Sequence, residues 1–191
     1  PYTTTLTDTL DTLTGCHSLR SAEAGLLLQD RTFYAAIEGS TSAKDDVLPQ
    51  LWELSFDSST GNLVLTGTMT FPGVDTNWNI HHFGIMGDII AVPIMQLDGG
   101  NGEVFTINKD AWTLTGKQYT AGNGSGHCEG SMSQNMIVVT NHYGNDVTLI
   151  DLDDDSVVNV EIATEIESFG TYIQSHANHV TEDGLLYHFF E

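Results

Sequence analysis

The chain has 191 residues, with 26 Asp or Glu against 5 Lys or Arg, so its formal net charge is −21. Such a charge repels nucleic acid and anionic membranes, which excludes both as expected partners and favours metal ions or basic proteins. Hydrophobic residues make up 40% of the chain and 19 residues are glycine, a mixture typical of an all-β domain rich in turns. An acidic surface is also typical of adaptation to salt, and that interpretation stays open.

Short apolar runs between Gly-, Asn- and Asp-rich turns predict a succession of β-strands. The first unit has RTFYAAIEG and then LWELSFDSSTGNLVLTGTMTF, separated by an inserted polar segment. A second unit begins with DIIAVPIM and continues through GGNGEVFTINKDAWTLTGKQYT. A third begins with NMIVVTN and continues through VTLIDL and VVNVEI, and DGLLYHFFE predicts the first strand of a fourth. No helical periodicity of useful length interrupts this order.

The turns after LSFD, FTIN and LIDL recur roughly every 45–50 residues, the spacing of β-propeller blades. We therefore expect an all-β fold: a partial β-propeller with about four blades in a single domain, 1–191. The expected blades are approximately 16–72, 81–120, 127–168 and an incomplete 176–191. A second copy, another chain or a missing segment would complete the ring, and residues 1–15 could supply outer strands. A plain β-sandwich of evenly spaced hairpins is the alternative.

The stretch VVTNHYGNDVTLIDLDDDSVVNVEI, at 138–162, resembles the YVTN-type β-propeller repeat. It has a Val-Thr-Asn strand, a short Gly/Asn turn, a Leu-Ile-Asp strand and a closing strand. The resemblance implies a four-stranded antiparallel blade, which must stack against neighbouring blades to bury both of its faces.

Histidines recur in one position of the proposed repeat, just before each expected first strand. His81 stands in IHHFGIM, His127 in GHCEGSM and His176 in SHANHVT, and His17 in GCHSLRS lies near the same position of the first unit. In a propeller, side chains in equivalent positions of successive blades face one mouth of the central channel. Converging imidazoles predict a site for zinc or copper.

We expect His81, His127 and His176 to be metal ligands, helped by His82, His179 and His17. Oxygen ligands or supporting partners could come from Glu129 and Asp88, and a soft ligand from Cys128. His142 and His188 are interpreted as surface or packing residues outside the site. In the alternative reading, the repeated histidines are architectural and only hydrogen-bond to the next blade.

The segments HHFG and HCEG are similar to segments of the propeller-type periplasmic zinc metallochaperones, which implies metal-handling roles for His81, His82 and His127. The propeller of nitrous oxide reductase, which holds copper through histidines, is similar in outline but requires more histidines. A calcium site at Asp98, Asn101 and Glu103 is also possible by residue type. Cys16 and Cys128 could form a disulfide, although two cysteines define no framework.

The sequence therefore predicts a secreted or periplasmic metal-binding propeller that binds or delivers zinc or copper without catalysing a reaction. One alternative is a structural or adhesive extracellular propeller with an acidic surface, and another is a lactonase-like or oxidoreductase propeller. The sequence contains neither a G-x-S-x-G motif nor a phosphate-binding loop, two motifs that would favour an enzyme. The sequence has no run of 18 apolar residues, so we expect no membrane-spanning helix. Because the sequence starts at Pro1 rather than Met, we expect a processed chain or a fragment.

Overall fold

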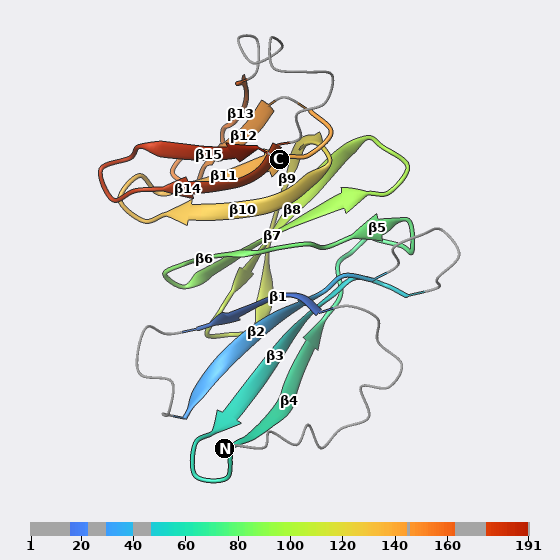
Figure 1. Ribbon diagram of the computed structural model, residues 1–191, viewed down its shortest axis with the longest axis vertical. Helices are drawn as coiled ribbons and strands as arrows, with labels where there is room; N and C mark the ends of the chain where they lie inside the picture. Colours follow the sequence, from blue (N-terminus) through green and yellow to red (C-terminus); the bar gives the residue numbers. More distant parts are fainter. Residues whose placement is uncertain (1–15, 23–29, 40–46, 145, 163–174, 191) are drawn as a thin grey trace. The chain divides into compact units, whose positions relative to one another are not determined.

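A computed structural model describes residues 16–22, 30–39, 47–144, 146–162 and 175–190. Throughout these residues the regular elements are β-strands in antiparallel sheets (Figure 1), which confirms the all-β prediction. The chain divides into two compact units, Pro1–Ile80 and His81–Glu191, which are described separately. The described part of the chain contains no helix long and apolar enough to cross a membrane.

The first unit contains a four-stranded antiparallel sheet in the order β1-β2-β3-β4. Its strands are β1 (Cys16–Ser21), β2 (Arg31–Ile37), β3 (Gln50–Asp57) and β4 (Asn62–Met69). The short strand β5 (Trp78–Asn79) follows, and an isolated bridge pairs Asn79 with Gly39.

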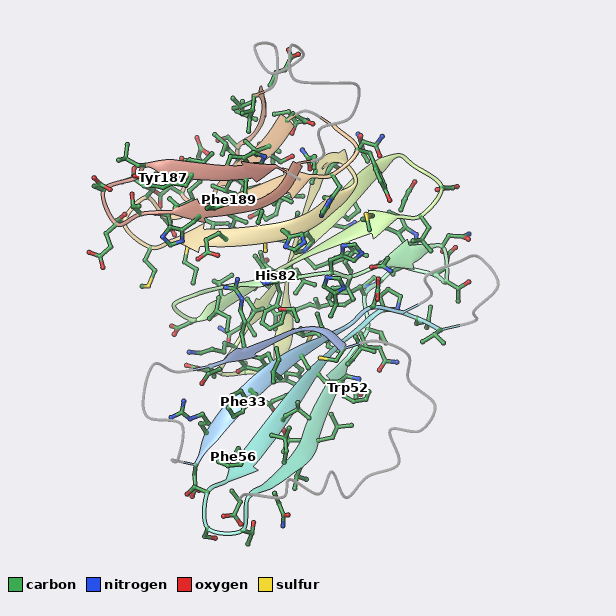
Figure 2. All side chains as sticks on the ribbon, viewed as in Figure 1. Phe33, Trp52, Phe56, His82, Tyr187 and Phe189 are labelled. Carbon is green, nitrogen blue, oxygen red and sulfur yellow. The ribbon has the colours of Figure 1, made fainter. Side chains whose placement is uncertain are left out.

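Alternation of apolar residues explains why these segments form a sheet with its own core. Ala35 and Ile37 of β2 pack with Trp52 and Leu54 of β3 in one buried cluster. Phe33 packs against this cluster and meets Phe56 edge to face, with ring centroids 6.3 Å apart (Figure 2). Because residues two apart share a face, one register buries the whole set.

The second unit contains two four-stranded antiparallel arrangements and one two-stranded sheet. The first arrangement is β6 (Gly84–Met86), β7 (Ile89–Gln96), β8 (Asn101–Asn108) and β9 (Thr113–Asn123). The second is β10 (Ser125–Ser131), β11 (Met136–Asn141), β12 (Asp146–Asp151) and β13 (Val157–Glu161). The two-stranded sheet is β14 (Ser175–Val180) and β15 (Leu186–Phe190).

The core of the second unit lies between the first two of these sheets. Met86, Ala91 and Val104 from one sheet join Ile137 and Val139 from the other in a single buried cluster. Strands β7 and β11 are formed by the segments DIIAVPIM and NMIVVTN. These segments are almost entirely apolar between their first and last residues, and the middle residues of both strands are buried. A strand covered on both faces requires such a continuous apolar run.

One prediction about the order of strands is wrong. Three histidine-bearing segments expected to precede the first strand of a unit themselves form that strand: GCHSLRS gives β1, GHCEGSM gives β10 and SHANHVT gives β14. DGLLYHFFE is accordingly the second strand of its sheet, β15, and not the first. Their polar and glycine-rich composition hides them, because a strand pairs through its backbone whatever its side chains.

Glycines in β10 have a packing reason. A Cβ atom on Gly130 would lie 2.7 Å from the Cβ of Met86, a residue of the neighbouring sheet. The close approach of the two sheets thus requires a residue without a side chain here. Residues 1–15, proposed as outer strands, lie outside the described residues. The predicted blade limits, and completion of the ring by a second copy or another chain, stay predictions.

Candidate functional site

Four histidines of the second unit lie together, and we call them the imidazole cluster: His81, His82, His127 and His142. His81 and His82 precede β6, His127 is in β10, and His142 directly follows β11. The antiparallel pairing of β10 with β11 places His127 opposite Thr140. The backbone N–H of His142 donates a hydrogen bond to the carbonyl of Gly124, 2.8 Å away, which holds the end of β11 beside the start of β10.

The rings of the imidazole cluster are in mutual contact. The centroid of His81 lies 6.1 Å from that of His127 and 5.6 Å from that of His142, and the ring planes are steeply inclined in both pairs. His127 and His142 are 5.1 Å apart. His82 stacks on His127, with centroids 5.1 Å apart and planes inclined by 20°.

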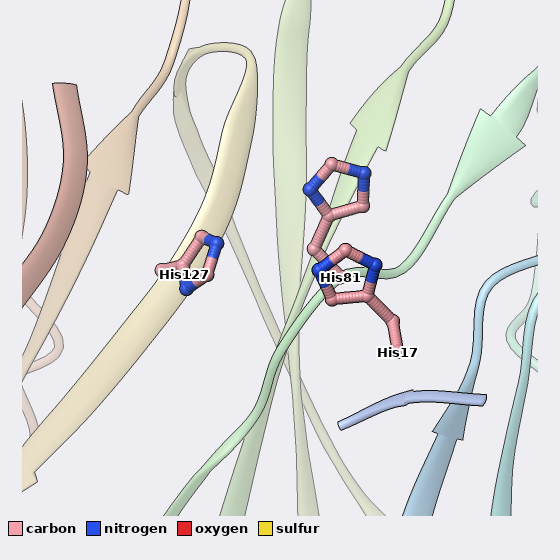
Figure 3. Close-up of side chains that lie close together, drawn as sticks. All are labelled: His17, His81 and His127. Carbon is pink, nitrogen blue, oxygen red and sulfur yellow. The ribbon is translucent and has the colours of Figure 1, made fainter. Parts of the chain in front are cut away.

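His81 and His127 bring two ring nitrogens near each other. One ring nitrogen of His81 lies within 4.8 Å of one ring nitrogen of His127, and both side chains are partly buried (Figure 3). In addition, the Nε2 atoms of His127 and His142 are buried from solvent. The cluster therefore offers imidazole nitrogens in a sheltered place, the donor type that zinc and copper share.

Glycine 126 makes room for these rings. A Cβ atom at Gly126 would overlap the His142 ring at Cδ2 and Nε2, and it would lie 3.5 Å from Nδ1 of His81. The imidazole of His142 therefore occupies the space that any other residue at position 126 would fill.

The other expected ligands, His17, His176 and His179, are on strands β1 and β14. His17 is an exposed residue of β1 in the first unit, where its Nδ1 lies 3.9 Å from Oε2 of Glu38. His179 of β14 has a side chain 59% exposed and lies 3.9 Å from Oε1 of Glu129. The backbone of His176 is in β14, and its side chain lies outside the described residues.

The structure also describes candidate ligands that are not histidines, among them Cys128, Asp88 and Glu103. Cys128 is buried in the core, where its Sγ donates a hydrogen bond to the carbonyl of Ala91 at 3.1 Å, and both cysteines of the chain are thiols. Asp88 is exposed in the β6–β7 turn, at the end of β6 away from His81. Glu103 accepts a hydrogen bond from Thr120 Oγ1 at 3.3 Å, and calcium binding there stays a prediction.

His142, which the sequence analysis interpreted as a surface or packing residue, is buried beside the selected histidines. It is 7% exposed and contacts two histidines that the sequence analysis selected. The signal was present in the order of elements: His142 directly follows a strand that runs antiparallel to the segment carrying His127. Once GHCEGSM is recognised as a strand, the end of β11 must lie beside the beginning of β10.

His188 lies on β15, outside the imidazole cluster, and its half-buried position lowers the pKa of its imidazole by desolvation. The folded state therefore favours the neutral ring, whereas the unfolded chain takes up a proton at about pH 6.5. Stability is expected to decline as the pH falls through that value. In His188→Phe the free energy of unfolding, measured by chemical denaturation from pH 7.5 to 5.5, should fall less steeply than in wild type. Equal slopes would contradict this.

Comparisons with known proteins support the fold and leave the family open. No known protein family matches the chain, and neither does any curated protein. The solved structure of the Dos1 propeller is similar to this chain, with 14% sequence identity and a TM-score of 0.51. The similarity covers 78% of this chain and 36% of the Dos1 chain. A candidate 6-phosphogluconolactonase from Bacteroides uniformis ATCC 8492 has 18% sequence identity and a TM-score of 0.48. That similarity covers 92% of this chain and 64% of the other protein's chain.

The chain thus spans about a third of the length of the Dos1 propeller structure and less than two thirds of the second protein. Together with the antiparallel sheets, the first likeness confirms the prediction of a partial β-propeller fold. Membership of the YVTN-type repeats or of the zinc metallochaperones stays a prediction.

Proposed function

We propose that this chain is a metal-binding β-propeller module that holds zinc or copper through histidines of its imidazole cluster, His81 and His127 among them, for binding or delivery outside the cytoplasm. The observation that supports it most is the pair formed by His81 and His127. These residues are 46 positions apart in the sequence, yet their ring nitrogens lie within 4.8 Å.

The separation is close to what one metal ion requires. With Zn–N bonds of about 2.0–2.1 Å and a tetrahedral angle, two nitrogens on one zinc lie roughly 3.3 Å apart. Movement of each ring nitrogen by about 0.75 Å would close a difference of roughly 1.5 Å. Imidazole suits zinc and copper, whereas calcium and magnesium prefer oxygen ligands, so the cluster should discriminate between these two groups of cations.

The net charge of −21 supports the same proposal through long-range electrostatic attraction of cations. A strongly negative surface raises the local concentration of cations and speeds their arrival, an effect that weakens as salt screens the charges. This attraction acts on every cation, so the selectivity must come from the imidazoles.

Titration of the purified chain with Zn²⁺, Cu²⁺ and Ca²⁺ tests the proposal. We expect one tight zinc or copper ion per chain by isothermal titration calorimetry at pH 7.5. Binding should weaken as the pH falls through about 6.5, because protons compete for neutral imidazole. Calcium serves as the control for unspecific attraction to the acidic surface. If calcium binds as well as zinc and copper, or if none of the three binds, the proposal fails.

The lactonase-like and oxidoreductase alternatives, and the structural or adhesive alternative, stay predictions. They differ from metal delivery in what the purified chain would do: turn over a substrate, or bind a partner without needing zinc or copper.

A further inference from the structure

We infer that the metal is held by three imidazoles, those of His81, His127 and His142, and that His82 is a stacking partner and not a ligand. The inference rests on the proposed function and extends it, because it assigns a ligand outside the repeated histidine positions. The ligand class is a divalent cation of borderline softness, such as Zn²⁺ or Cu²⁺.

Distances between the rings support the assignment. An imidazole centroid lies about 1.1 Å beyond its coordinating nitrogen, so two rings on one tetrahedral zinc have centroids roughly 5 Å apart. The three pairs among His81, His127 and His142 have separations of 5.1, 5.6 and 6.1 Å. To share one ion, the ring of His81 must move roughly 0.5–1 Å towards the other two, and the rings must turn their nitrogens to a common point.

Ring orientation separates ligands from the stacking partner. The lone pair of an imidazole nitrogen lies in the ring plane, so a metal shared by two rings must lie close to both planes. The ring plane of His81 is inclined by 80° to that of His127 and by 77° to that of His142, and the planes of His127 and His142 by 53°, so none of these pairs is stacked. His82 and His127 are inclined by 20° and stacked, so their planes do not meet near the two rings.

The backbone around His142 is fixed in advance of metal binding. Asn141, which precedes it, is fully buried, and its Nδ2 donates to Asp146 Oδ2 and to Thr148 Oγ1, each at 3.0 Å. The backbone N–H of His142 itself donates to Gly124. Because these bonds hold the chain in place, little conformational entropy is lost when the ring binds the ion.

Three imidazoles leave a fourth position on a tetrahedral ion for water or an incoming donor. Zinc sites with such an open position exchange ligands, whereas sites closed by four protein ligands are structural. An open position is what a module that passes its metal to another molecule requires.

The test compares His142→Gln with His82→Gln, a matched pair in which a polar side chain of similar size replaces one ring of the same cluster. Loss of a true ligand should exceed the effect of losing a supporting group, so His142→Gln should weaken zinc affinity by more than about 100-fold. Because a stacked ring makes no bond to the ion or to its ligands, His82→Gln should cost no more than about tenfold, the lower end of the range for supporting residues. With Cu²⁺ bound, electron paramagnetic resonance should show three nitrogen couplings in wild type and in His82→Gln, and two in His142→Gln.

A measurement on the wild-type chain keeps the inference testable if a variant does not fold. In nitrogen-15 spectra of the histidine rings, added Zn²⁺ should shift one ring nitrogen each of His81, His127 and His142, and leave the nitrogens of His82 close to their starting positions.

The outcomes separate the inference from the function. If wild type binds zinc and His142→Gln binds it equally well, or if the His82 nitrogens take up the ion, the assignment is overturned and metal binding stands. If wild type binds neither zinc nor copper, the proposed function falls, and the assignment falls with it.

Discussion

Replacement of both His81 and His127 by alanine is expected to abolish zinc and copper binding. These two residues have ring nitrogens within 4.8 Å of each other. Of the two imidazoles that remain, only His142 is assigned as a ligand, and one imidazole cannot compete with water for the ion at micromolar concentration. The expected loss in affinity is more than about 1000-fold, since each ligand should contribute more than the 10–100-fold of a supporting residue. Calorimetric titration of wild type and the double variant measures it.

The control for this experiment is His179→Ala, which removes a histidine whose side chain is 59% exposed and lies beside Glu129. Its zinc affinity should equal that of wild type. Circular dichroism of all three proteins checks that the β-sheet content is unchanged. Retention of a tight zinc site in the double variant would rule out the imidazole cluster as the binding place.

The largest expected effect on stability comes from Val139→Ala. Val139 is fully buried on β11, in the core between the two four-stranded arrangements of the second unit. Loss of two buried methyl groups removes about 0.8 kcal/mol each of transfer free energy, and the cavity adds to the cost. We expect the free energy of unfolding of this unit to fall by about 2–3 kcal/mol, measured by urea denaturation.

Val158→Ala is the matched control, because it makes the same change in the same sheet. Val158 lies on β13 and is 55% exposed, so little apolar burial is lost and the expected cost is below about 1 kcal/mol. Equal destabilisation by both substitutions would show that the buried cluster around Val139 does not carry the stability of the sheet.

The strands that the sequence reveals are those whose side chains alone specify them. DIIAVPIM and NMIVVTN are short apolar runs rich in β-branched residues, and LWELSF alternates, so burial in a sheet is the arrangement that these patterns favour. β10 is different: SGHCEGS has neither pattern. It becomes a strand because β11 offers backbone hydrogen-bonding groups and because Gly130 lets it lie close to Met86.

The residues of the candidate site also fall into two groups: those that the sequence could select and those that only the structure brings together. The spacing of the repeat was enough to select His81 and His127 together, because equivalent positions of neighbouring sheets are brought together by any regular stacking. It could not select His142, whose proximity depends on the return of β11 antiparallel to a strand that the sequence conceals. Nor could it show that His82, adjacent to His81 in sequence, stacks on His127.

By itself, then, the sequence determined that this chain is all-β, that its strands come in repeated units and that it carries a large negative charge. Those properties follow from local composition and periodicity, which act residue by residue. Only the tertiary structure decided which imidazoles meet and at what inclination. Ring distances and planes depend on how separate segments pack, and a space left by one glycine, Gly126, is enough to bring His142 beside His81.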